Sequence, residues 1–282
     1  MSKHKTLTAS LLIAVLLIAL ALTAACSKAG DAEQKLVVGV SPSPHAEILR
    51  QVVDDLKKEG VELVVREYSD YVLPNRDLAD GEIDANYFQH LPYFEEFITR
   101  EKLDLVSLGG IHIEPMGIYS AKHQSLEDLP EGAEVMIPND TTNCGRALLL
   151  LQKQGLIKLS VQDVSATEKD VVENPKQLKF TALEAAAIPL VYKDADIAVI
   201  NGNYAIQHEL NPLKDALKLE DGESPFVNII AIRRKDRDDP RFEKLIKALQ
   251  SEKIQNFILE KYEGSVIPAF TDADGKSVTP EK

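Results

Sequence analysis

The sequence predicts an α/β protein of two lobes, each with three layers and a β-sheet in the middle. Short apolar segments alternate with amphipathic segments from residue 35 onward, a pattern that is typical of βαβ units. The alternation occurs in two series that meet near Tyr119. The chain has 282 residues, and at roughly 100–200 residues per domain this length favours two domains.

The first series begins with a strand at 36–40, which is nearly all apolar, as expected for a strand buried on both faces. Ser43 and Pro44 offer a helix cap and a first-turn proline, so we expect a helix over 44–59 that ends at Gly60. The same unit recurs in strands at 61–66, 85–89 and 103–108 and in helices at 73–79 and 93–100.

The second series predicts the other lobe and the return of the chain to the first. Its elements are strands at 134–137, 178–181 and 197–200 and helices at 142–154 and 183–190. An apolar segment at 226–232 and helices at 241–250 and 252–262 follow. We expect a hinge near Tyr119 and Asn228, with lobe 1 comprising residues 35–118 and 229–282 and lobe 2 comprising residues 119–228.

The N-terminus has the three parts of an export signal. A basic start with Lys3 and Lys5 precedes an apolar run at 7–25, and Cys26 follows two alanines. We expect a lipoprotein signal peptide at 1–25, lipid such as palmitate on Cys26, and a flexible tether at 26–34. The alternative is an uncleaved membrane anchor, since the run approaches the roughly 20 residues that span a bilayer. Either way, the protein is expected at the cell membrane on its extracytoplasmic face, periplasmic or cell-surface.

The composition disfavours several classes of function. The formal net charge of −13 disfavours a nucleic-acid partner, because an acidic surface repels phosphate backbones. No nucleophile elbow, phosphate loop or zinc helix occurs, so we expect no enzyme, no catalytic residue and no cofactor. The six histidines show no metal-ligand spacing, so no metal site is expected, and His45, His123 and His208 are interpreted as surface or cap residues. Cys144 is interpreted as a small buried hydrophobe.

Arg146 is a candidate anion-binding residue. It lies near the start of the predicted helix that follows strand 134–137, where free amides and the helix dipole favour an anion. Its guanidinium can hold a carboxylate by two hydrogen bonds, although a solvated surface arginine is an equally good interpretation. Asn201 and Asn228 lie beside predicted strands and could bind an ammonium group, although asparagines there are mostly turn residues.

Tyr71, Phe88 and His90 form a second candidate group. Alternate residues of an extended segment share a face, so Phe88 and His90 point one way while Tyr87 and Gln89 point the other. An aromatic face closed by an imidazole suits a thioether. The alternative, which the residues alone favour, is that the aromatics belong to the core and His90 ends a helix.

Six short segments occur in an order that is more specific than any single motif. They are Tyr71-Val-Leu-Pro-Asn75, Asp84-Ala-Asn-Tyr-Phe-Gln-His90, Glu114-Pro-Met-Gly-Ile-Tyr119, residues 138–146, Val172-Glu-Asn-Pro-Lys176 and Ser224-Pro-Phe-Val-Asn228. With them the chain resembles the methionine-binding lipoproteins of the NlpA family, the extracytoplasmic binding components of methionine ABC importers. The resemblance implies a two-lobed periplasmic-binding-protein fold (type II-like) and a monomer that captures L-methionine and delivers it to an ABC transporter permease and its ATPase.

The resemblance also implies a set of ligand-binding residues. They are Tyr71, Phe88, His90, Asn143, Arg146, Asn201 and Asn228. By this resemblance Arg146 binds the ligand carboxylate beside Asn143, the aromatic group and His90 line the side-chain pocket, and the other two asparagines contact the amino-acid backbone. Asn203 is a weaker candidate. Thr141, where a proline is usual, and Cys144 depart from the family pattern without removing an implied contact.

Three alternatives stay open. The same fold could bind another small amino acid or a methionine peptide. A surface lipoprotein could work mainly as an adhesin or sensor with the binding fold retained. An extracytoplasmic enzyme could use the same two lobes, although the missing catalytic set argues against it.

Overall fold

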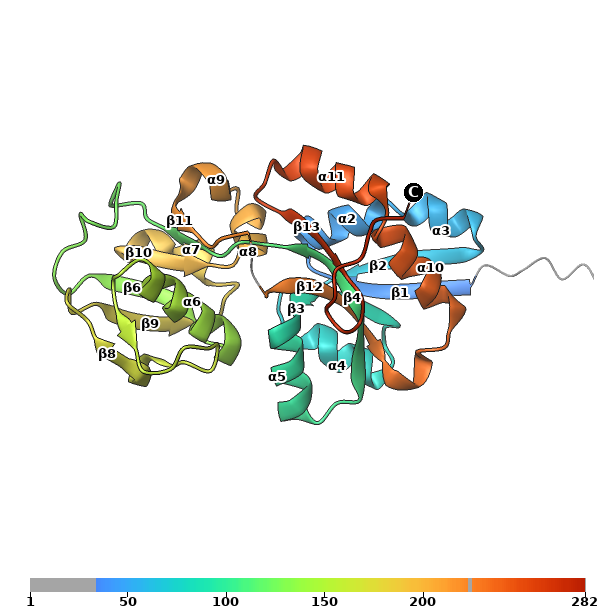
Figure 1. Cartoon of the computed structure of the whole chain (residues 1–282), viewed down its shortest axis with the longest axis horizontal. Helices are drawn as coiled ribbons and strands as arrows, with labels where there is room; N and C mark the ends of the chain where they lie inside the picture. Colours follow the sequence, from blue (N-terminus) through green and yellow to red (C-terminus); the bar gives the residue numbers. More distant parts are fainter. Residues whose placement is uncertain (1–33, 223–224, 282) are drawn as a thin grey trace, which may run out of the picture. The chain divides into compact units, whose positions relative to one another are not determined.

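The computed structural model describes residues 34–222 and 225–281, and these form two main β-sheets (Figure 1). The predicted signal peptide, the lipidation site Cys26 and all of the predicted tether except Gln34 lie outside the described residues. Gln34, the last residue of the predicted tether, is the first residue of β1.

The first sheet has six strands in the order β13-β4-β12-β3-β1-β2. Their bounds are β1 Gln34–Val40, β2 Val61–Glu67, β3 Ala85–His90, β4 Leu105–Ile113, β12 Val227–Arg233 and β13 Ile267–Thr271. β1 and β3 are parallel, as the βαβ pattern predicts. β12 lies between β3 and β4 and is antiparallel to both. The chain returns from lobe 2 into this sheet and runs in the opposite direction.

Helices cover both faces of this sheet (Figure 1). α2 Glu47–Arg50, α3 Val53–Lys58, α10 Pro240–Leu249 and α11 Glu252–Tyr262 lie on one face, and α4 Leu73–Asp80 and α5 Leu91–Glu101 lie on the other. The helix predicted over 44–59 is not continuous: a π-helical turn, η2 Pro42–Ala46, precedes α2, and a turn at 51–52 separates α2 from α3. The sheet and these helices are called lobe 1.

The second sheet has five strands in the order β11-β5-β10-β6-β9. Their bounds are β5 Gly117–Tyr119, β6 Glu134–Pro138, β9 Lys179–Leu183, β10 Ile197–Ile200 and β11 Ala216–Leu219. α6 Thr141–Lys153 packs on one face, and α7 Ile188–Val191 and α8 Gly202–Gln207 pack on the other. The helix predicted over 183–190 is mostly absent, since β9 runs to Leu183 and α7 starts only at Ile188, just before Pro189. This sheet and its helices are called lobe 2.

Short elements complete the described chain. They are β7 Lys158–Leu159, β8 Val171–Glu173, α9 Pro212–Asp215, η3 Glu168–Asp170, η4 Tyr192–Asp194 and η5 Arg234–Asp236.

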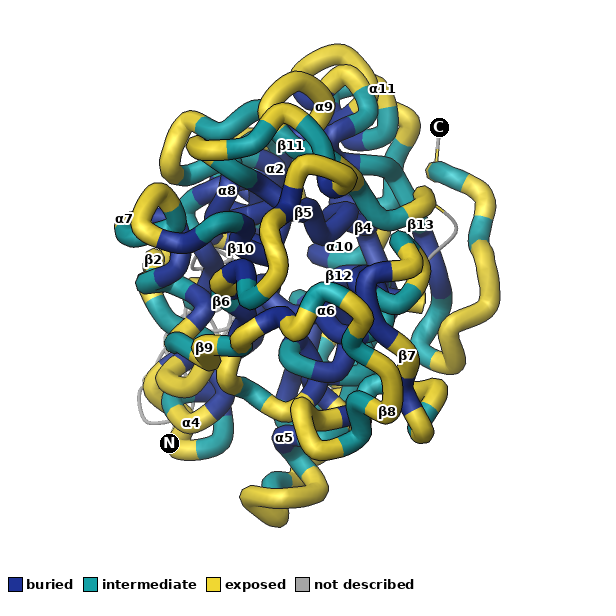
Figure 2. Tube along the Cα trace, turned by 90° about the vertical axis from the view of Figure 1, so that its left-hand side faces the viewer, coloured by how far each residue is buried: buried dark blue, intermediate teal, exposed yellow. Residues whose placement is uncertain are grey.

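The chain passes between the lobes twice. The first crossing is residues 114–116, between β4 and β5, and the second joins β11 to β12. The inner strands β3, β10 and β12 are buried, whereas the edge strands β9 and β11 and many of the connecting loops are half-buried or exposed (Figure 2). The two-lobed, three-layer α/β fold predicted from the sequence is therefore confirmed, while the predicted domain boundaries stay a prediction.

Candidate functional site

A narrow cavity lies between residues of the two lobes. The space in it that the centre of a water-sized sphere can reach is about 20 Å³, roughly what one water molecule needs. Its lining residues are Tyr71, Phe88, Gln89, His90, Tyr93, Glu114, Asn143, Arg146, Asn201, Gly202, Asn203 and Asn228. The structure thus brings together every ligand-binding residue that the sequence singled out, and it adds Gln89, Tyr93, Glu114, Gly202 and Asn203.

His90 ends β3 and begins α5. Its Nδ1 accepts a hydrogen bond from the backbone N–H of Tyr93 at 3.1 Å, which caps the helix. The proton of the neutral ring is therefore on Nε2, which donates to Oδ1 of Asn143 in lobe 2 at 3.1 Å. Burial lowers the pKa of His90 to about 3, so the ring is neutral at pH 7. His90 is thus both a helix-terminal residue, at the N-terminus of α5, and a residue of the cavity wall.

A bulge at Phe88 changes which side chains of β3 face the cavity. β12 pairs Ile229 with Gln89 and Ile230 with Tyr87, which leaves Phe88 as an extra residue in β3. Strict alternation therefore fails at this point, and Gln89 joins Phe88 and His90 in the cavity wall. The side-chain amide of Gln89 is held by Asn75 of α4 and Asn86 of β3, so the direction of this side chain relative to Phe88 and His90 stays a prediction.

Aromatic rings form part of the cavity wall. Tyr71 lies with its ring centre 4.8 Å from that of Tyr204, 5.9 Å from that of Tyr93 and 6.0 Å from that of Phe88. The Tyr71 hydroxyl donates to Oδ1 of Asn203 in lobe 2 at 2.5 Å. These rings belong to the core and line the cavity at once, so the two interpretations of this group do not exclude each other.

The amides of Asn143, Asn201 and Asn203 form another part of the cavity wall. Oδ1 of Asn143 accepts from Nδ2 of Asn201 at 2.8 Å, in addition to the bond from His90. Oδ1 of Asn201 and Nδ2 of Asn203 are buried and have no hydrogen-bond partner within the described part of the chain. A buried amide atom without a partner is costly, so the cavity offers one acceptor and one donor to a polar ligand.

Arg146 lies in the second turn of α6 and is only 4% exposed. The helix starts at Thr141 with Asp140 as its cap, whose carboxylate accepts a hydrogen bond from the backbone N–H of Asn143 in the first turn. Nε and Nη2 donate to the Glu220 carboxylate, at 2.8 Å to Oε1 and 2.5 Å to Oε2. The two-bond arrangement predicted for a ligand carboxylate is thus made with Glu220 in this structure.

Arg146 also contacts both crossings between the lobes. Nη2 donates to the backbone carbonyl of Glu114 in the first crossing at 2.8 Å. In the second crossing, the guanidinium carbon lies 4.1 Å from the centre of the Phe226 ring, and the Glu220 carboxylate also accepts from the backbone N–H of Met116 at 2.9 Å.

The Glu114 carboxylate sits in a buried polar network. Its Oε1 lies 2.7 Å from Nε2 of His112 and 3.3 Å from Nε2 of His45, and its Oε2 accepts from the backbone N–H of Asn203 at 2.9 Å. Nδ1 of His112 lies 2.5 Å from the Tyr87 hydroxyl. Burial lowers the pKa of His45 to about 4 and that of His112 to about 3, so both rings are neutral donors at pH 7, and burial raises the pKa of Glu114.

The interpretation of His45 as a surface or cap residue was wrong. It is fully buried in η2, and its Nε2 also lies 3.0 Å from Oδ1 of Asn228. One ligand atom each from His45, His112 and Glu114 lie within 4.8 Å of one another, a spacing that could hold a metal ion. Nε2 of His45, Nε2 of His112 and Oε1 of Glu114 each have a polar partner, whereas Nδ1 of His45 is buried without one among the described residues.

Comparison with known proteins identifies the family. The model of the NlpA lipoprotein family matches residues 36–270. The chain belongs to the NlpA lipoprotein family. The methionine-binding lipoprotein MetQ of Bacillus subtilis is 44% identical over 265 residues, which cover 90% of this chain and 96% of that protein. The D-methionine-binding lipoprotein MetQ of Escherichia coli is 44% identical over 225 residues, which cover 79% of this chain and 82% of that protein.

A solved structure of the NlpA type is similar across the whole fold. It is a nutrient-binding protein from Burkholderia cenocepacia bound to methionine, with a TM-score of 0.79 and 45% sequence identity. The match covers 83% of this chain and 99% of that one. Relatives of this NlpA-family chain are thus binding proteins rather than enzymes. Within residues 34–222 and 225–281, no helix combines the length and apolar character needed to cross a membrane.

Sequence reasoning missed several residues of this NlpA-family site. Glu114 stands in one of the segments that carry the family resemblance, so that signal was available, and Asn203 had been considered as a weaker candidate. Glu220 gave no signal, because it follows a short strand and meets Arg146 only through the fold, 74 residues away in sequence.

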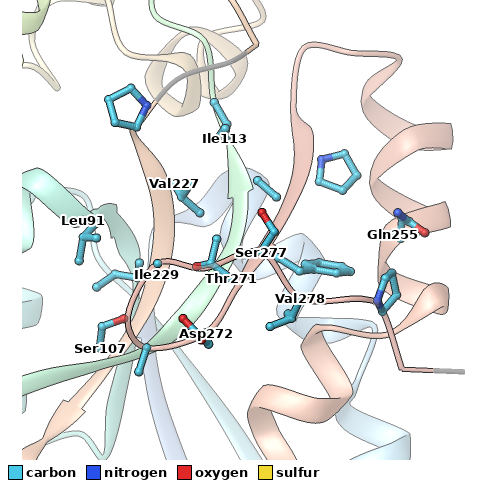
Figure 3. Close-up of a pocket in the computed structure, with 17 residues that line it drawn as sticks. Leu91, Ser107, Ile113, Val227, Ile229, Gln255, Thr271, Asp272, Ser277 and Val278 are labelled. Atoms are coloured by element: carbon cyan, nitrogen blue, oxygen red, sulfur yellow. The ribbon is translucent and has the colours of Figure 1, made fainter.

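A wider hollow lies elsewhere in lobe 1 (Figure 3). Val227 and Ile229 of β12 face it from one side, and Thr271 and Val278 of the C-terminal segment face it from the other. Asp272 is the one charged side chain among its described lining residues. The narrow cavity, which joins charged, amide and aromatic groups from both lobes, is the better candidate for a specific ligand site of this NlpA-family protein.

Proposed function

We propose that this NlpA-family lipoprotein captures L-methionine, or a close analogue, between its two lobes and delivers it to an ABC importer. The observation that carries the proposal is the narrow cavity, which is lined by aromatic rings and by polar side chains from both lobes. The space that remains in it is roughly that of one water molecule, so a ligand the size of methionine would enter only after the lobes separate.

The polar residues of the cavity would recognise the ammonium and carboxylate groups that all α-amino acids share. We assign the carboxylate to Arg146 and Asn143 and the ammonium group to Asn201, Asn228 and Glu114. The unpartnered Oδ1 of Asn201 supports this assignment, because an ammonium proton would satisfy it.

The aromatic residues of the cavity would determine which ligand side chain binds. Tyr71, Phe88, His90 and Tyr93 offer apolar surface and ring edges. Sulfur–aromatic contacts contribute about 0.3–1.5 kcal/mol, and burial of an apolar side chain contributes about 1.5–3 kcal/mol. Discrimination by an apolar pocket is modest, about 1–3 kcal/mol per methylene, so other small amino acids of similar shape remain the alternative ligands.

We propose closure of the lobes as the binding mechanism, with lobe 1 formed by residues 35–118 and 229–282 and lobe 2 by residues 119–228. Ligand contacts on both lobes are what closure by a population shift requires. Hydrogen bonds already join the lobes around the cavity, from Tyr71 to Asn203 and from His90 to Asn143. A ligand would add to this set of contacts and favour the closed state.

The cellular setting follows from the relatives and from the N-terminal sequence. We propose that residues 1–25 are removed, that lipid on Cys26 holds the protein at the extracytoplasmic face of the membrane, and that a monomer delivers its ligand to a permease with its ATPase. The names of the relatives, which are lipoproteins that bind methionine, support this proposal. A role as adhesin or sensor would leave ligand binding intact but not importer docking.

Calorimetric titration tests the proposal. The chain from residue 26 onward, with Cys26→Ser to remove the lipid site, would be unfolded and refolded to release bound ligand and then titrated with L-methionine, D-methionine, leucine and glutamine. We expect methionine to bind and glutamine to give no heat. Absence of methionine binding in the refolded protein would overturn the proposal.

A further inference from the structure

Helix α8 of lobe 2 continues past the narrow cavity and contacts lobe 1 there. The residues at its start line the cavity, and they are Asn201, Gly202 and Asn203. Tyr204 and Gln207, which follow in the same helix, are not among the residues that line it. Contacts that these two side chains make with lobe 1 are therefore separate from the wall of the ligand site.

Two side chains of α8 donate hydrogen bonds to backbone carbonyls of lobe 1. The Tyr204 hydroxyl donates to the carbonyl of Ser69 at 3.1 Å, and Nε2 of Gln207 donates to the carbonyl of Ser43 at 3.1 Å. Ser69 lies in the loop between β2 and α4, and Ser43 lies in η2, so two separate segments of lobe 1 are engaged. Because both acceptors belong to the backbone, the bonds depend on the two donors of α8 and on the position of lobe 1.

Apolar contacts accompany these two bonds. Ile206, which precedes Gln207 in α8, packs against the main core cluster of lobe 1. In the opposite direction, Tyr71 of lobe 1 packs against the core of lobe 2, with its ring centre 4.8 Å from that of Tyr204. Asn203, Ile206 and Gln207 have the spacing of neighbours on a helix surface, so they share one face. This face of α8 therefore lies against lobe 1.

Separation of the lobes breaks these contacts. Each hydrogen bond joins a donor in lobe 2 to an acceptor in lobe 1, so it is present while the lobes are together and absent once they part. An interaction that exists in one of two states shifts the equilibrium toward that state. Tyr204 and Gln207 therefore favour closure, and they do so whichever ligand occupies the cavity.

We propose that Tyr204 and Gln207 form a latch, which keeps the lobes closed over the ligand and sets its rate of release without contacting it. The proposal rests on the proposed function, which supplies the ligand and the closure. Both residues are positioning residues, because they act on the ligand only by holding the two walls of the cavity together. The latch therefore multiplies the affinity for every ligand by the same factor, whereas residues of the cavity wall discriminate among ligands.

Gln207→Glu tests the latch, because it keeps the shape of the side chain and replaces the donor by an oxygen. We expect it to weaken the binding of L-methionine, L-ethionine and L-norleucine by one common factor of about 2- to 10-fold, as loss of a single hydrogen bond implies. The loss should appear as faster dissociation, measured by chase of radiolabelled L-methionine. A common factor in the dissociation rate is a result that a purely local role of Gln207 in folding would not produce.

Gln124→Glu is the matched control, since Gln124 is an exposed glutamine in the loop between β5 and β6 and the chemical change is the same. It should leave the affinities and the dissociation rate unchanged. An unchanged dissociation rate in Gln207→Glu would overturn the latch and leave the proposed function standing. Losses that differ among the three ligands beyond the error of the measurement would do the same, because they would mean that Gln207 acts inside the cavity.

Two further measurements cover the remaining outcomes. If Gln207→Glu does not fold, as judged by circular dichroism, Tyr204→Phe removes the other bond and decides by the same criteria. If the native chain binds none of the three ligands, the proposed function fails, and small-angle X-ray scattering without ligand decides on the latch. A larger radius of gyration for Gln207→Glu than for the native chain would then support the latch, because the lobes separate more often, and equal radii would overturn it.

Discussion

Replacing Arg146 by alanine tests how much the fold depends on the pair formed with Glu220. The side chains are 4% and 12% exposed, and the two residues share two hydrogen bonds. Removal of one partner of a buried pair leaves the other charge uncompensated, at a cost of about 3–5 kcal/mol. We therefore expect the Arg146→Ala variant to lose about 3–5 kcal/mol of unfolding free energy without ligand, and to lose methionine binding.

Urea unfolding followed by circular dichroism at pH 7 measures this loss. Arg100→Ala is a matched control: Arg100 pairs with Glu96 on the surface of α5, with side chains 46% and 26% exposed. An exposed pair of this spacing contributes about 0.3–0.5 kcal/mol. A cost for Arg146→Ala that is no larger than that of the control would refute the reasoning.

A double variant locates the cause of the loss. If the unpaired Glu220 carboxylate is responsible, Arg146→Ala combined with Glu220→Ala should be less destabilised than the sum of the two single variants by at least about 1 kcal/mol. Additive losses would mean that the contacts of the guanidinium with Phe226 and Glu114, rather than the ion pair, account for the effect.

Three further outcomes follow from the site and its surroundings. The pKa values of His45, His90 and His112 are lowered by burial to about 4, 3 and 3, so their stabilisation is complete above pH 6.5 and is lost as the pH falls toward these values. We expect unfolding free energy to drop by up to about 1.4 kcal/mol per pH unit for each histidine, measured by urea unfolding at pH 7, 6 and 5; a flat profile would contradict this. Gly145→Ala should cost at least about 1–3 kcal/mol, because the added Cβ would lie 2.2 Å from the backbone oxygen of Val164, whereas Cys144→Ala beside it should cost less in the same denaturation assay. Tyr71→Phe should weaken methionine binding about 2- to 10-fold in calorimetry through loss of the hydrogen bond to Asn203, and unchanged affinity would exclude that bond from the closed state.

The sequence pattern predicted the parts of the fold in which local signals and burial agree. The strand now seen at Ile197–Ile200 is an uninterrupted apolar run, and α11 has its cap at Ser251, so both were predicted within a few residues. α7 was predicted too early, because the apolar residues after 183 have helical spacing while pairing with β6 extends β9 to Leu183. Local periodicity cannot register such a pairing with a distant strand.

The candidate site divides in the same way. The predicted ligand-binding residues stand in short segments with recognisable sequence patterns, and the structure gathers them in one cavity. Their partners His45 and Glu220 come from distant parts of the chain, and the polar bonds that bring them to the site span 183 and 74 residues of sequence. No window along the chain contains both members of such a bond, so their roles follow only from the three-dimensional structure.

The contact of Arg146 with both crossings has a consequence for the timing of ligand release. The guanidinium of Arg146 bonds the carbonyl of Glu114 and the carboxylate of Glu220. The two crossings about which the lobes would close are therefore joined through a single side chain. Opening of the lobes about these crossings would strain or break this tie, so we expect it to slow the release of a ligand held by Arg146. The residence time of the ligand and the stiffness of the hinge would then depend on the same bonds. A substitution that loosens the crossings would shorten the residence time without altering any atom that the ligand contacts.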